Sequence, residues 1–263
     1  MMHTRYGDVA VTLEDFVATV EIQRPPNNVL DIDLLQALAT AFETLDNAAK
    51  CRAIVLASVG KHFCAGAHFH YLQGEAEQQT WAAEAGNPLY AEVARLHACR
   101  KPVVGAIQGA AIGGGLGLAL IPDFRVLCPE TRFAANFVKL GFHPGSGLTY
   151  LLPRLIGWQR ATLLCSTARQ IGGEEAFAWG LGEVLTEQPN VRAAAVELAR
   201  EIAANAPLAV QSVRATMRAG LVAEIKAATA HEYREQHFLR QTADHKEGLR
   251  AVTERRPGYF VGR

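Results

Sequence analysis

Two short segments rich in glycine and alanine are the strongest candidates for chemistry in this chain. Residues 62–68 read His-Phe-Cys-Ala-Gly-Ala-His, and residues 109–117 read Gly-Ala-Ala-Ile-Gly-Gly-Gly-Leu-Gly. Small residues leave backbone N–H groups open to a ligand. Two such loops brought together can direct two N–H donors at one oxygen, which is the arrangement of an oxyanion hole. The alternative is that both loops are tight turns needed only for packing.

Each loop follows a continuous apolar run, which is typical of a strand covered on both faces. Residues 53–57 precede the first loop and residues 103–107 precede the second. The uncharged stretch 103–122 contains six glycines, which disfavour a membrane-spanning helix and favour a strand, a loop and a helix. The sequence therefore places both candidate loops at the ends of buried strands.

The remaining pattern predicts an α/β fold with a mixed sheet and a helical C-terminal region. Residues 9–13 and 16–22 alternate as in a hairpin, and Asp31 or Asp33 could cap the helix that follows. Further helices are predicted over residues 75–100, 192–204, 207–221 and 222–240, and a strand over 123–127. We expect a core over residues 1–204 and a helical region over residues 205–263.

Composition excludes several classes of protein. The 263 residues carry 26 basic and 26 acidic side chains, so nothing indicates a nucleic-acid surface. Five cysteines without a Cys-x-x-Cys spacing favour reduced thiols over a disulfide framework or a zinc site. No apolar signal segment is visible at the N-terminus, and a cytoplasmic protein is expected.

Taken together, the motifs resemble the crotonase superfamily, also called the enoyl-CoA hydratase/isomerase family, over essentially the whole chain. The resemblance is carried by residues 63–67, by residues 101–115 with Asp123, by Leu140-Gly141 and Pro144-Gly145 with residues 152–157, and by Asp244, Glu247-Gly248 and residues 254–257 with Phe260. It implies a crotonase-like spiral of ββα units, C-terminal helices that make trimer contacts, and a trimer or a hexamer of two trimers.

The resemblance also implies an acyl-coenzyme A thioester as ligand, with coenzyme A as part of the substrate and no separate cofactor or metal. By position, the backbone N–H groups of Ala67 and Gly114 would bind the thioester oxygen. Ala65, His68 and Phe69 would lie along the coenzyme A channel.

Two departures from the family pattern concern the acid and base. Hydratases that this chain resembles use two glutamates, and the matching positions here hold Gly117 and Phe137. General acid–base groups contribute about 10²–10⁴ each to a rate, so ordinary hydration is not expected. An aspartate nucleophile, as in the related dehalogenases, would fall at Gly145 and is absent too.

His143 is then the candidate acid or base, because it lies on the turn before Pro144-Gly145. The alternative is a turn histidine that binds a backbone carbonyl. We interpret Ser146 as a turn hydroxyl, and His68 and His70 as contacts to the ligand's pantetheine or phosphate groups.

Two functions remain open. The first is a crotonase-family acyl-CoA lyase or isomerase that stabilises a thioester enolate by a route other than two-glutamate hydration. The second is a non-catalytic acyl-CoA-binding protein that lacks the acid and base. A dinucleotide-binding dehydrogenase is excluded, because the glycine run lacks the last glycine of Gly-x-Gly-x-x-Gly.

Overall fold

The computed structural model describes residues 2–67 and 86–263, and the described strands form two sheets. The seven-stranded sheet has the order β1-β2-β3-β4-β5-β7-β10. Its strands are β1 (Met2–Tyr6), β2 (Val9–Glu14), β3 (Val17–Ile22), β4 (Ala53–Ser58), β5 (Val103–Ile107), β7 (Phe124–Leu127) and β10 (Val184–Leu185). The three-stranded sheet is formed by β6 (Ala110–Ile112), β8 (Arg132–Ala134) and β9 (Gln170–Gly172).

The large sheet is antiparallel at its start and parallel from β3 onward. The predicted hairpin is confirmed as β2 and β3, joined by Asp15 and Phe16. Both residues have positive φ, 48° and 68°. Positive φ at both positions lets a two-residue turn follow the right-handed twist of the two strands. β4 and β5 are buried along their whole length, as their continuous apolar runs predict.

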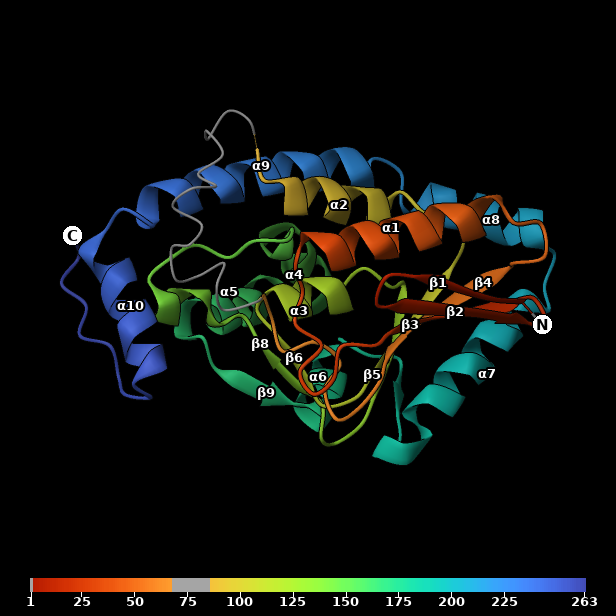
Figure 1. Ribbon diagram of the computed structural model, residues 1–263, viewed down its shortest axis with the longest axis horizontal. Helices are drawn as coiled ribbons and strands as arrows, with labels where there is room; N and C mark the ends of the chain where they lie inside the picture. Colours follow the sequence, from red (N-terminus) through yellow and green to blue (C-terminus); the bar gives the residue numbers. More distant parts are fainter. Residues whose placement is uncertain (1, 68–85) are drawn as a thin grey trace.

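Ten α-helices lie within the described residues, and they cover both faces of the large sheet (Figure 1). They are α1 (Ile32–Asn47), α2 (Pro88–His97), α3 (Gly114–Ala119), α4 (Leu148–Ile156), α5 (Trp158–Thr167), α6 (Gly173–Trp179), α7 (Val191–Ala203), α8 (Pro207–Met217), α9 (Leu221–Leu239) and α10 (Ala243–Thr253). Asp31, not Asp33, caps α1, because its carboxylate accepts from the Leu34 amide at 2.9 Å.

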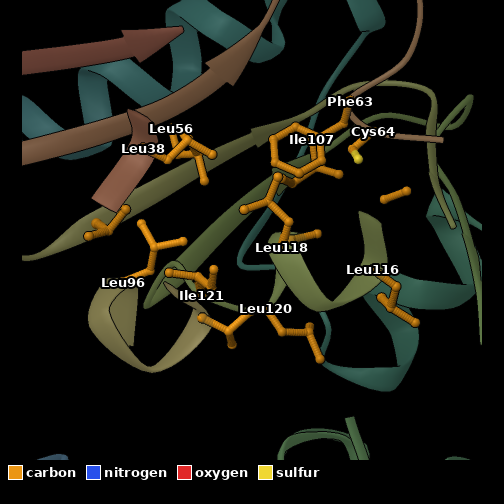
Figure 2. Packing of buried hydrophobic residues seen from close by; sticks show 14 of the residues in the cluster. Leu38, Leu56, Phe63, Cys64, Leu96, Ile107, Leu116, Leu118, Leu120 and Ile121 are labelled. Atoms are coloured by element: carbon orange, nitrogen blue, oxygen red, sulfur yellow. The ribbon is translucent and has the colours of Figure 1, made fainter. Parts of the chain in front are cut away.

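Alternation along β4 divides the core between the two sheet faces. Ile54 and Leu56 join the larger cluster on the α1 side, whereas Val55 packs with α7 on the other. Figure 2 shows part of the larger cluster, where Phe63 from the first glycine-rich loop lies among Ile107 of β5 and Leu118 of α3. The two candidate loops are thus attached to one core.

The C-terminal region is helical, as predicted. The helices predicted over 207–221 and 222–240 are observed as α8 and α9. Of the predicted helix over 75–100, the described part contains α2 only. Figure 1 shows α9 running alongside α2 between α8 and α10, which lie at opposite ends of the molecule. No helix within residues 2–67 and 86–263 is long and apolar enough to cross a membrane.

Asp123 ties α8 to the start of β7. Its carboxylate accepts from the Val103 amide at 2.9 Å, from Arg214 Nε at 2.8 Å and from Arg218 Nη1 at 2.6 Å. Arg218 Nη2 also lies 3.3 Å from His97 Nδ1. Since a guanidinium only donates, Nδ1 accepts and the His97 proton is on Nε2, which has no partner among the described residues.

His97 is expected to make the fold sensitive to acid. Its side chain is 2% exposed, and burial together with the charges of Arg218 and Arg214 lowers its pKa from 6.5 to about 3. Between those values the unfolded chain binds the extra proton, so stability falls as the pH falls. From pH 7 to pH 4.5 this histidine should remove about 2 kcal/mol of unfolding free energy.

Urea unfolding at both pH values measures this loss. His97→Gln should lose less stability on acidification than the wild type, because the unfolded variant has no imidazole to protonate at this position. Replacing the exposed His231 by glutamine is the matched control and should follow the wild type. Equal acid sensitivity in all three proteins would contradict the assignment.

Candidate functional site

The two glycine-rich loops lie against each other through backbone hydrogen bonds. The Cys64 amide donates to the Ala110 carbonyl at 2.9 Å, and the Ile112 amide donates to the Cys64 carbonyl at 3.1 Å. On its other side the first loop is held by the Leu30 amide, which donates to the Gly66 carbonyl at 2.9 Å. The chain after β4 and the chain after β5 therefore form one layer of paired backbone.

Glycine is required where α3 meets the first loop. A Cβ atom at Gly115 would lie 2.0 Å from the Cys64 carbonyl oxygen, and one at Gly66 would lie 3.0 Å from the Ile112 carbonyl oxygen. Gly66 also has a φ of 109°, a conformation that favours glycine. Packing thus explains part of the small-residue pattern, and the same packing holds the two loops in register.

Replacing Gly115 by alanine is expected to destabilise the protein by about 3 kcal/mol, because a backbone oxygen cannot rotate out of the way of the new Cβ. Helix propensity alone would favour alanine there by about 1 kcal/mol, so the sign of the change tests the contact. Thermal or urea unfolding measures it. Gly172→Ala is the matched control, since nothing lies within 4 Å of its Cβ position, and a stable Gly115→Ala protein would contradict the prediction.

Both loops line one cavity of about 280 Å³. The described residues of its wall are mostly apolar, with a few polar groups: Leu30, Leu35, Ala65, Gly66, Ala67, Asn87, Leu89, Tyr90, Val93, Ile112, Gly113, Gly114, Leu118, Ile121, Asn136, Phe137, Leu140, Phe142, Ser146, Gln236, Arg240 and Val252. The structure therefore brings three of the predicted site residues together, namely Ala65, Ala67 and Gly114. His68, Phe69 and His70 lie outside the described residues.

The amides of Ala67 and Gly114 are backbone donors of residues that line the cavity. Within the described part of the chain neither N–H group donates to a protein acceptor. Gly114 is the first residue of α3, where an N–H has no acceptor inside the helix. Two unused backbone donors at one largely apolar cavity suit the binding of a carbonyl oxygen that gains charge.

Ser146 occupies the space beside Gly117. A Cβ atom at Gly117 would lie 2.5 Å from Ser146 Cβ. Ser146 itself has a φ of 63°, which is strained for a residue other than glycine. Phe137 lies in the cavity wall, with its ring edge-to-face to Phe142 at 5.5 Å between centroids.

Residues of α9 hold the turn that carries Ser146. Gln236 Nε2 donates to the His143 carbonyl, and Gln236 Oε1 accepts from Tyr90 Oη, both at 2.9 Å. The buried carboxylate of Glu232 accepts from the Gly147 amide at 2.8 Å and from the Thr149 hydroxyl at 2.6 Å. Burial raises the pKa of Glu232 and the pKa of the Tyr90 hydroxyl, so the phenol stays protonated near neutral pH.

Sequence reasoning missed Tyr90, Gln236 and Arg240 as cavity residues. The available signal was the spacing of Glu232, Gln236 and Arg240, which places all three on one side of α9. That spacing shows which residues share a face but not what the face contacts. The packing of α9 beside α2 and the turn supplies that information.

The structure does not bring His143 into the cavity wall with Ala67 and Gly114. Its Nδ1 lies 2.8 Å from the Pro144 carbonyl oxygen, and its ring is edge-to-face to His231 at 6.0 Å between centroids. This arrangement is the turn histidine given above as the alternative. No aspartate, glutamate or histidine is among the described residues of the wall.

Comparisons with known proteins give matches along almost the whole chain. The sequence model of the family described as "Enoyl-CoA hydratase/isomerase" matches residues 12–263. A probable enoyl-CoA hydratase of Rhodobacter capsulatus is 34% identical, over 98% of this chain and 99% of that protein. A crotonyl-CoA hydratase of Syntrophomonas wolfei is 31% identical over 98% of this chain and 99% of its own length. Among solved structures, an enoyl-CoA hydratase/isomerase from Pseudoalteromonas atlantica superposes with a TM-score of 0.85 at 27% identity, covering 97% of this chain and 100% of that one.

Proposed function

This chain belongs to the enoyl-CoA hydratase/isomerase family, and we propose that its cavity binds an acyl-coenzyme A thioester and stabilises the enolate of that thioester. The N–H groups of Ala67 and Gly114 would donate to the thioester oxygen as it gains negative charge. The observation that carries the proposal is that these two amides line one cavity and donate to no acceptor among the described residues. Coenzyme A enters as part of the substrate.

The reaction we propose is not two-carboxylate hydration. The positions at which the resemblance implies glutamates hold Gly117 and Phe137, and Ser146 fills the space beside Gly117. A general base must come within about 3 Å of the proton that it removes. No carboxylate or imidazole is among the described residues of the cavity wall, so in the reaction we propose the α-proton would pass to water while the two amides stabilise the enolate oxygen.

The lack of a carboxylate or imidazole among the described cavity residues also favours a second candidate function. In that function the protein binds acyl-CoA without converting it. Calorimetry with butyryl-CoA and crotonyl-CoA tests binding, and NMR in D₂O tests exchange of the α-protons of the butyryl thioester. Binding with exchange supports an enzyme, whereas binding without exchange supports the non-catalytic protein. Failure to bind either thioester would contradict both candidates. His143→Ala shows whether the histidine acts, because a role in proton transfer requires slower exchange in the variant.

We also propose that the protein assembles as a homotrimer or as a hexamer of two trimers through the region 205–263. Large apolar side chains of this region are exposed in the single chain: Leu208 is 80%, Met217 82% and Tyr259 80% exposed. Such side chains in one region favour burial against another subunit. Sedimentation velocity measures the mass directly, and a monomer at micromolar concentration would contradict the assembly.

A further inference from the structure

Arg240 is the only charged residue among the described residues that line the cavity. It caps the C-terminal end of α9, and its guanidinium lies over the Phe142 ring at 5.8 Å from the centroid. The side chain is exposed, and no acidic group of the described chain lies within ion-pair distance. Among the residues that the structure describes, this cation at the edge of an apolar cavity has no ion-pair partner.

Three acidic side chains of α9 and α10 are engaged elsewhere, and Glu235 of α9 forms no ion pair with Arg240. Glu232 accepts hydrogen bonds from the turn that begins α4, and Asp244 accepts from the amides of Val261 and Gly262 at 2.7 and 2.9 Å. Glu247 pairs with Arg256. The guanidinium is therefore available to an anion brought by a ligand.

The apolar wall beside Arg240 favours the binding of an anion by this side chain. The Phe142 ring is edge-to-face to Phe137 and to His245, with ring centroids 5.5 and 5.2 Å apart. An apolar wall lowers the local polarity and strengthens an ion pair formed there. Arginine also matches a carboxylate in geometry, because its planar fork can donate two parallel hydrogen bonds.

On the basis of the proposed function, we propose that the cavity selects acyl-CoA thioesters whose acyl group carries a second carboxylate, and that Arg240 binds this carboxylate. A cavity of about 280 Å³ suits an acyl group and not a whole nucleotide. Arg240 and the two oxyanion amides line the same cavity, and the proposal requires one acyl group to extend from the amides to the guanidinium. The phosphates of coenzyme A are the other anionic groups of such a ligand, and the experiment separates the two sources.

The experiment compares a glutaryl thioester with its neutral isostere, in which a carboxamide replaces the carboxylate. Each is prepared on coenzyme A and on pantetheine, which has no phosphate. Wild-type protein should bind the glutaryl form about tenfold more tightly on both carriers, as expected for a charge-assisted pair at a partly exposed site. Arg240→Gln should remove the preference on both carriers.

Arg234→Gln is the matched control, because Arg234 is exposed on the same helix and is not in the cavity wall. It should keep the preference for the carboxylate. The proposal is overturned if the wild type binds both isosteres equally, or if Arg240→Gln weakens all coenzyme A thioesters alike and no pantetheine thioester. The second result would assign Arg240 to a phosphate. If no thioester binds on either carrier, the proposed function itself fails.

Discussion

Gly114→Pro is expected to slow enolate formation by about 10²–10³, the usual effect of removing one donor from an oxyanion hole. Proline has no N–H group, so the substitution removes the donor that we assign to the thioester oxygen. Gly114 is the first residue of α3, a position at which proline fits the helical backbone. The change therefore tests the donor with little effect on the helix.

Gly114→Ala is the control, because it introduces the same Cβ and keeps the N–H group. In both variants the Cβ meets the flexible end of Leu30, with Cδ2 at 3.1 Å. The measurement is exchange of the thioester α-protons in D₂O, with calorimetry for binding and circular dichroism for folding. If the proline variant folds and exchanges as fast as the alanine variant, the Gly114 amide does not bind the oxygen.

Hydration of crotonyl-CoA is expected to appear when carboxylates are placed at positions 117 and 137. General acid–base groups contribute about 10²–10⁴ each to a rate. A variant with both Gly117→Glu and Phe137→Glu should therefore hydrate faster than a variant with either change alone. Ser146 must change as well, since its Cβ lies 2.5 Å from the Cβ position of residue 117. Ser146→Gly removes that atom and also relieves the left-handed strain at φ 63°, roughly 1 kcal/mol.

The triple variant Gly117→Glu, Phe137→Glu and Ser146→Gly is compared with the version that carries glutamines at 117 and 137. Loss of absorbance of the conjugated thioester follows hydration. The glutamate protein should hydrate at least 10²-fold faster than the glutamine protein. The double variant with Gly117→Glu and Phe137→Glu, which keeps Ser146, should hydrate slowly. If the double and triple variants hydrate at equal rates, the serine does not block the site.

Local patterns in the sequence were sufficient to predict the elements next to the site. The apolar runs at 53–57 and 103–107 became β4 and β5, and the alternation at 9–22 became a hairpin. β1 was missed because its residues are largely polar, and β6, β8 and β9 because strands of three residues are too short for a periodic signal.

The sequence by itself determined the family, the two glycine-rich loops, and the absence of carboxylates at positions 117 and 137. These depend on residue identity and spacing along the chain. Only the tertiary structure decided that Ser146 packs against Gly117, that His143 is not in the cavity wall, and that Tyr90, Gln236 and Arg240 border the cavity. Such contacts join residues far apart in sequence, and the packing of α9 across the turn fixes them, which no local periodicity encodes.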